Sequence, residues 1–171
     1  MFIRRPVYLL IIGSLCALPL APAQAESELS HLSRSEMLTL SETRSEEAWA
    51  AFALIYERLD PSLRDLVPGQ TWTDEDRAAA ACIYDKVVAS DQREAYERYL
   101  LELPEISQII VDNPDITLMT LERYPEVTQM PDIDGIMAFN RDCGQMALMQ
   151  RRMQDSGLWM KMQEVMMQNM E

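Results

Sequence analysis

Residues 73–87 read TDEDRAAAACIYDKV, a helix-start pattern followed by apolar residues at helical spacing. Thr73 and Asp76 have the spacing of a capping box, and the acids between them favour the positive end of a helix dipole. Apolar residues then recur at helical spacing, at Ala80, Ile83, Tyr84 and Val87. The stretch predicts an amphipathic helix over 74–89 with Cys82 at the flank of its buried stripe. Capping explains the acidic residues at its start without a metal ion.

One further helix is predicted on each side of this one. Before it, Thr43 and Glu46 have capping-box spacing, and the helix is expected to end at Asp60-Pro61. After it, Asp91 paired with Glu94 is expected to cap a third helix. The first apolar stripe contains Trp49, Phe52, Ala53 and Tyr56, and the second contains Tyr96, Tyr99, Leu100 and Leu103. The alternation typical of strands is missing, so we expect an all-α domain of five to eight helices.

Between residues 103 and 133 the sequence predicts short helices that each begin at a proline. Residues 103–109 read LPEISQI and residues 124–130 read YPEVTQM, two similar heptads that start 21 residues apart. Proline followed by an acid is typical of a helix start, because the amides of the first turn have no partner within the helix. The expected starts are Pro104, Pro114, Pro125 and Pro131. Helices this short bury their apolar faces only against neighbouring helices or against a bound partner.

Residues 132–171 predict a Met-rich pair of helices. A long helix from about Asp132 would carry Ile136, Phe139, Cys143, Met146 and Met153 on one side. Gly157 is the expected left-handed cap, and Leu158 begins the final helix. The stretch 132–135 does not fit a calcium loop, because its glycine comes fourth and not sixth.

The first 25 residues have the layout of a secretory signal peptide. Arg4 and Arg5 precede an apolar run over residues 7–20, and residues 23–25 read AQA, a typical cleavage site. The run is shorter than the ~20 residues of a membrane span, so we expect cleavage and no membrane insertion afterwards. We expect export to a periplasm, or secretion beyond it. Residues 26–43 are expected to form a loosely ordered Ser/Glu-rich lead-in to a single helical domain over 44–171.

Two cysteines remain once Cys16 leaves with the signal peptide. Cys82 and Cys143 are 61 residues apart and lack the Cys-x-x-Cys spacing of thiol–disulfide enzymes. An exported chain meets an oxidising compartment, where an even pair usually forms a disulfide. The sequence therefore predicts one structural disulfide, Cys82–Cys143.

Charge and composition argue against several function classes. The chain has 15 basic and 28 acidic residues, a net charge of −13, which becomes −15 once Arg4 and Arg5 are removed. Such a charge argues against nucleic acids and anionic membrane surfaces as partners. The glycines are too scattered for a phosphate-binding loop, and the single histidine, His31, falls in the lead-in. We therefore expect no catalytic residues and a protein that is not an enzyme.

Methionine is concentrated near the C-terminus, where the last 35 residues hold nine of the 13. On a helical projection one arc carries Leu158, Trp159, Met162, Val165, Met166 and Met170, and Met160 and Met167 lie opposite it. Because methionine adapts to different partners, we predict a binding surface of Trp159, Met160, Met162, Met166, Met167 and Met170. Packing of the arc on the domain is the plainer interpretation. The metal alternative is a Cu(I) site of Met162, Met166 and Met170, since thioethers are soft ligands.

The helix starts within residues 103–133 resemble the STI1 or DP-type helical repeats of co-chaperones. The matching residues are Pro104-Glu105-Ile106, Gln108-Ile109, Pro114-Asp115-Ile116 and Pro125-Glu126-Val127. The resemblance implies short helices around an apolar groove that takes up hydrophobic client segments.

These features predict an exported, non-enzymatic protein that binds another polypeptide through an apolar, Met-rich groove, in a chaperone-like role. The groove is expected to combine the proline-started helices with the C-terminal methionines, and no cofactor is expected. A periplasmic Cu(I)-binding protein, with copper as its cofactor, is the alternative. A structural subunit of a fixed assembly is the second alternative.

Overall fold

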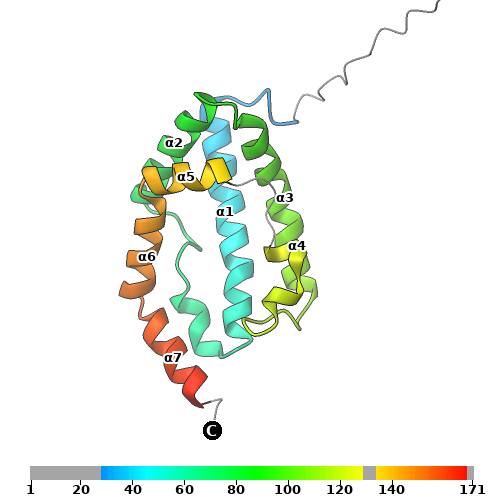
Figure 1. The fold of residues 1–171 in the computed structure, drawn as a ribbon, viewed down its shortest axis with the longest axis vertical. Coiled ribbons are helices and arrows are strands. Elements are labelled where there is room, and N and C mark those ends of the chain that lie inside the picture. The colour runs from blue at the N-terminus through cyan, green and yellow to red at the C-terminus, as the bar shows by residue number, and fades with distance from the viewer. Residues whose placement is uncertain (1–27, 129–133, 169–171) are drawn as a thin grey trace, which may run out of the picture.

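The computed structural model describes residues 28–128 and 134–168, and these residues form an all-α fold with no strand (Figure 1). The predicted fold class is thereby confirmed. The predicted signal peptide, Pro131 and Met170 lie outside the described residues. Within them, no helix is both long and apolar enough to cross a membrane. The elements are α1 (Arg34–Glu57), η1 (Pro61–Leu66), α2 (Asp74–Val88), α3 (Arg93–Asp112), η2 (Leu121–Arg123), α4 (Pro125–Thr128), α5 (Asp134–Asp142), α6 (Gln145–Asp155) and α7 (Leu158–Gln168).

Helix α1 lies at the centre of the fold. Figure 1 shows α3 and α4 on one side of it and α2, α6 and α7 on the other, with α5 crossing near one end. The central position requires apolar residues around the whole helix, because three core clusters meet on it. The first cluster joins α1 to α2, α3 and α5, the second joins it to α3 and α4, and the third joins it to η1 and α7.

Helix α1 begins ten residues earlier than predicted. Ser33 accepts a hydrogen bond from the Glu36 amide, and the Glu36 carboxylate accepts one from the Ser33 amide at 2.8 Å. The prediction of a loosely ordered lead-in is therefore wrong for residues 34–43, which are helical and in which Met37 and Ser41 are buried. Thr43 lies inside the helix, and its hydroxyl donates to the Thr39 carbonyl. Residues 33–46 hold three capping-box patterns, which begin at Ser33, Thr39 and Thr43, and burial of Met37 favours the first of them.

Helix α2 forms where it was predicted. The Asp76 carboxylate accepts hydrogen bonds from the amide and the hydroxyl of Thr73, at 2.7 and 2.9 Å. The predicted stripe, Ala80, Ile83, Tyr84 and Val87, is buried. The predicted cap of α3 by Asp91 is wrong: Gln92 occupies the N-cap position without a side-chain capping bond, and the Asp91 carboxylate accepts from the Gln92 side chain.

The prediction that short helices begin at prolines is mostly wrong. Of the three predicted starts that the structure describes, Pro104 lies inside α3, Pro114 lies in a turn, and Pro125 begins the four-residue α4. A proline inside a helix removes a backbone hydrogen bond and costs about 3 kcal/mol. The buried face of α3 continues on both sides of Pro104 and offsets this cost, through Leu100, Leu103, Ile106 and Ile110.

The long helix predicted from about Asp132 to a cap at Gly157 is broken in two within the described residues. Gly144 has φ +77° and separates α5 from α6, while Gly157, with φ +75°, ends α6 as predicted. The disulfide is confirmed: the Sγ atoms of Cys82 and Cys143 lie 1.98 Å apart. It joins α2 to the residue that follows α5.

Candidate functional site

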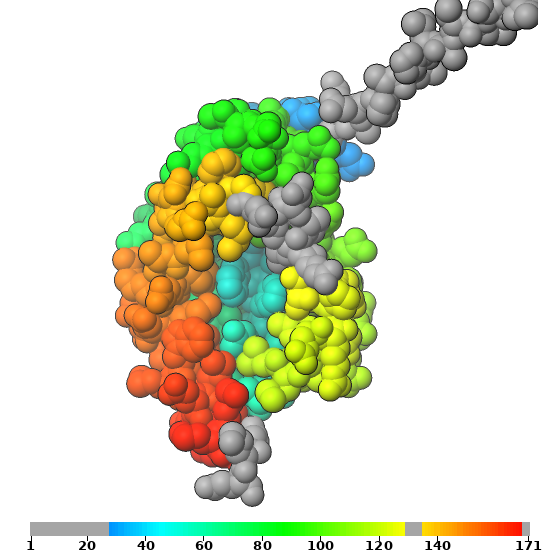
Figure 2. Space-filling model, viewed as in Figure 1, coloured from blue at the N-terminus to red at the C-terminus, as the bar shows by residue number. Residues whose placement is uncertain are grey.

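A partly open groove of about 1050 Å³ lies between α1, α2, α3, α5 and α6. The space-filling view shows the surface hollowed beside α6, with α1 at the floor of the hollow (Figure 2). Large apolar side chains dominate its wall. They include all three tryptophans of the chain and four methionines: Trp49, Trp72, Trp159, Met137, Met146, Met149 and Met153.

Two helices contribute lining residues at helical spacing. On α1 the groove residues are Ser41, Ser45 and Trp49, each four residues after the last, so they share one face. On α6 the methionines follow the i, i+3, i+7 pattern of a single stripe: Met146, Met149 and Met153. The groove therefore runs between two facing helix stripes.

Gly69 holds Trp49 at the groove wall. It has φ +90°, and a Cβ built on it would lie 2.8 Å from two ring carbons of the Trp49 indole. The loop before α2 thus approaches the indole more closely than any side chain would permit.

Replacing Gly69 with alanine is expected to lower the free energy of unfolding by about 2 kcal/mol, because a left-handed residue gains a Cβ that clashes with Trp49. Gly144→Ala is the matched control, since Gly144 is also left-handed but has no atom within 4 Å of a built Cβ. We expect the control to lose only about 1 kcal/mol. Urea denaturation followed by tryptophan fluorescence measures both. Equal losses for the two variants would contradict the close packing.

The tyrosines of the groove are neutral at physiological pH. The Tyr96 hydroxyl shares a 2.7 Å hydrogen bond with Ser41, whose hydroxyl also donates to the Met37 carbonyl. Burial raises the pKa of Tyr99 to about 12, with a smaller contribution from Tyr96. This part of the lining is uncharged and suits an apolar occupant.

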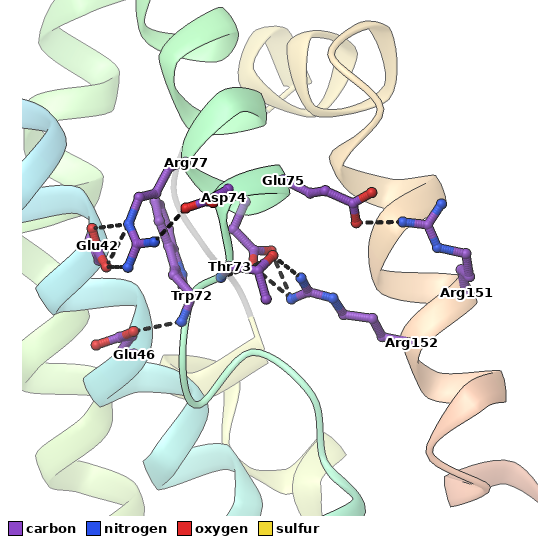
Figure 3. Close-up of polar contacts among 10 residues, drawn as sticks. Glu42, Glu46, Trp72, Thr73, Asp74, Glu75, Arg77, Arg151 and Arg152 are labelled. Atoms are coloured by element: carbon purple, nitrogen blue, oxygen red, sulfur yellow. Dashed lines mark hydrogen bonds and ion pairs between the residues drawn. The ribbon is translucent and has the colours of Figure 1, made fainter.

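A polar network holds α6 beside the start of α2 (Figure 3). The Arg152 guanidinium lies 2.7 Å from the Asp76 carboxylate, which is 1% exposed, and it also donates to the Thr73 hydroxyl. Arg151 pairs with Glu75 at 2.6 Å in a more exposed position.

The same end of α2 is tied to α1. Arg77 pairs with Glu42 at 2.6 Å, and the Trp72 amide donates to the Glu46 carboxylate at 2.6 Å. Figure 3 shows these two contacts on the side of α2 opposite the two arginines of α6. The start of α2 is thus anchored to the central helix.

One polar atom beside the groove has no partner. The Gln145 side-chain oxygen, at the first residue of α6, is buried and accepts no hydrogen bond from the described residues. Gln145 also belongs to the groove lining. A buried acceptor left unpaired costs about 1–3 kcal/mol.

The predicted binding surface is divided between the groove and α7. Trp159 lines the groove, and Met162 is half-buried in the third core cluster. Met160, Met166 and Met167 lie on the surface of α7 and are 73%, 41% and 64% exposed. Met170 lies outside the described residues. Of the proposed copper ligands the structure therefore places only Met162 and Met166, one half-buried and the other exposed.

The residues that sequence reasoning missed are Trp49, Trp72, Met137 and Met149. Met146 and Met153 were expected on one side of a helix but not in the binding surface. The i, i+3, i+7 spacing at 146–153 was the available signal. No described residue of 103–128 lines the groove, so the expectation that the proline-started helices form it is wrong. Val127 of α4 instead joins Ile106, Ile110 and Ile116 in the second core cluster.

In the part of the chain that the structure describes, no group of three or more histidine, cysteine, aspartate or glutamate side chains is placed to hold a metal ion. The chain matches no family model, no curated protein and no solved structure.

Proposed function

We propose that this protein is exported and, without catalysing a reaction, holds an apolar segment of another polypeptide in the groove. The observation that carries the proposal is the groove itself, about 1050 Å³ in volume and lined by three tryptophans and four methionines. Methionine and tryptophan side chains give the groove a large, adaptable apolar surface of the kind that binds peptides. The signal-like N-terminus and the Cys82–Cys143 disulfide support export.

The dimensions of the groove favour a helical segment. Its lining extends over residues 41–49 of α1, about 12 Å, and residues 145–154 of α6, about 14 Å. Two turns of a helix span a similar length and present apolar side chains at i, i+3, i+4 and i+7. An amphipathic helix is therefore the expected occupant.

The charge of the protein favours a basic occupant. Residues 26–171 carry 13 basic and 28 acidic residues, and residues 141–171 are neutral with four of each. The excess negative charge therefore belongs to the segment that contains α1, α2 and α3, which form one side of the groove. Such a field accelerates association with cationic partners.

The test uses a synthetic peptide of about 14 residues with leucine at helical spacing and lysine elsewhere. We expect it to bind residues 26–171 and to change their tryptophan fluorescence, while a peptide of the same composition with scrambled leucines binds at least about tenfold more weakly. Met146→Glu with Met149→Glu should weaken binding at least about tenfold, because two carboxylates then enter an apolar groove.

Two matched variants locate the site. Met160→Glu with Met167→Glu changes the same residue types on the exposed surface of α7, and we expect this variant to bind as the parent does. Loss of binding there, with normal binding in the groove variant, would move the site to α7. Equal binding of the ordered and scrambled peptides would show that charge alone attracts them and would overturn the proposal.

Copper binding is the second candidate, because the groove gathers four thioethers. Met146→Leu with Met149→Leu separates the two candidates, since leucine keeps the apolar surface and removes only the sulfur. A polypeptide site retains peptide binding in this variant. The copper alternative is measured by an anaerobic titration against a chromophoric Cu(I) chelator. If the groove is a copper site, the parent removes Cu(I) from the chelator and the leucine variant does not.

A further inference from the structure

Helix α6 forms one wall of the groove but is weakly held by apolar contacts. Seven of its residues line the groove: Gln145, Met146, Ala147, Met149, Gln150, Met153 and Gln154. Leu148 is its only buried residue. Elements with few buried apolar contacts open locally at a lower free energy than the core does.

Both ends of α6 are glycines with positive φ. Gly144 has open space around it, since a built Cβ would meet no atom within 4 Å, and Gly157 would meet only the flexible end of Met160 at 3.9 Å. The residue before Gly144 is Cys143, which the disulfide ties to α2. The N-terminal end of α6 is therefore anchored at Cys143, and the next residue is a glycine whose backbone dihedral angles can change without a side-chain clash.

The opposite end of α6 is held by ion pairs. Arg152 and Arg151, in the last turns of the helix, reach the start of α2 at Asp76 and Glu75 (Figure 3). Because Arg77 and Trp72 tie that end of α2 to α1, the arginines bind a fixed point. Met153 also packs against the third core cluster, so ion pairs and one apolar side chain together hold this end.

The closed arrangement leaves one polar group unsatisfied. The buried Gln145 oxygen, next to the joint, has no partner among the described residues. Outward movement of α6 would expose this oxygen to water, and buried groups of this kind need an explanation. The ion pairs therefore oppose a movement that the Gln145 oxygen favours.

We propose that α6 is a hinged wall of the groove, which moves on the glycine joints Gly144 and Gly157 while Leu158 stays packed, and is held closed by the contacts of Arg152 with Asp76 and Thr73. Opening widens the groove for entry of its occupant, and closure brings Met146, Met149 and Met153 against it. The gating role rests on the proposed function, whereas the hinge movement itself is a property of the free protein.

Hydrogen exchange on the free protein tests the hinge. We expect the amides of α6 to exchange at least about tenfold faster in Arg152→Met than in the parent, with the amides of α1 and α3 unchanged. Arg152→Lys, which keeps the charge, should lie between the two. Arg98→Met is the matched control: it removes an exposed arginine of α3 that pairs with Glu94 and touches neither α2 nor α6, and α6 should exchange as in the parent.

Two results would overturn the hinge. In the first, α6 of the parent exchanges only as fast as α1, so that it opens only when the whole fold unfolds. In the second, Arg152→Met accelerates α1, α3 and α6 by the same factor, which indicates general destabilisation.

Stopped-flow binding of the leucine–lysine peptide separates the hinge from the proposed function. We expect faster association in Arg152→Met than in the charge-matched control Arg98→Met. Equal association rates with normal affinity would overturn the gating role and leave the proposed function intact. Failure of the parent to bind the peptide would overturn the proposed function, while hydrogen exchange still decides the hinge.

Discussion

Removal of the Cys82–Cys143 disulfide is expected to lower the free energy of unfolding by about 4 kcal/mol. The bond closes a loop with a sequence separation of 61 residues, and in the chain-entropy model a loop of this length restricts the unfolded chain by that amount. For a domain of this size the melting temperature should fall by roughly 10 °C. Calorimetry of the Cys82→Ser, Cys143→Ser variant measures the effect.

The reductant dependence supplies the control for the disulfide. Dithiothreitol should lower the melting temperature of the parent to that of the double variant and should leave the variant unchanged. Both cysteines are half-buried, so serine introduces no fully buried hydroxyl. A double variant as stable as the oxidised parent would show that the bond adds no stability.

Replacing Arg58 with methionine is expected to lower the free energy of unfolding by about 3 kcal/mol. Arg58 follows α1, and its guanidinium donates to three backbone carbonyls at and beyond the end of α3: those of Ile110 at 2.7 Å, Asn113 at 3.0 Å and Ile116 at 2.8 Å. Methionine keeps the length of the stem but leaves these acceptors without their charged donor. Urea denaturation measures the loss.

Two further arginine variants define this role. Arg58→Lys keeps the charge, but a single ammonium group does not reproduce the fork of the guanidinium, so an intermediate loss is expected. Arg98→Met removes an exposed arginine of α3 that pairs only with Glu94, and it should cost less than about 1 kcal/mol. Equal stability of Arg58→Met and Arg98→Met would contradict the role of Arg58 in holding residues 110–116.

Local sequence pattern was sufficient where one element decides its own structure. The capping box at Thr73 and Asp76 and the stripe that follows it predicted α2, because both depend on neighbours within four residues. The left-handed glycine at 157 was predicted for the same reason. The disulfide followed from cysteine number and expected compartment, without geometry.

Local pattern failed where two patterns compete or where burial overrides propensity. Ser33 and Thr43 both begin a capping box, and only the packing of Met37 against α2 and α3 residues selects Ser33. Pro104 reads as a helix start, yet α3 passes through it because apolar residues on both sides are buried. In each case a contact from another part of the chain outweighs about 1–3 kcal/mol of local preference.

Composition and local pattern are enough to predict the fold class, the position of α2, the disulfide and the abundance of adaptable apolar side chains near the C-terminus. Which of these side chains form a groove depends on how the helices pack against one another. Trp49, Trp72 and Met149 are far apart along the chain, and no periodicity within one helix relates them. They meet because α1 lies at the centre and the disulfide, Gly144 and Arg152 hold α6 beside it. A site made by facing helices depends on distances between elements, which a pattern along one helix does not contain.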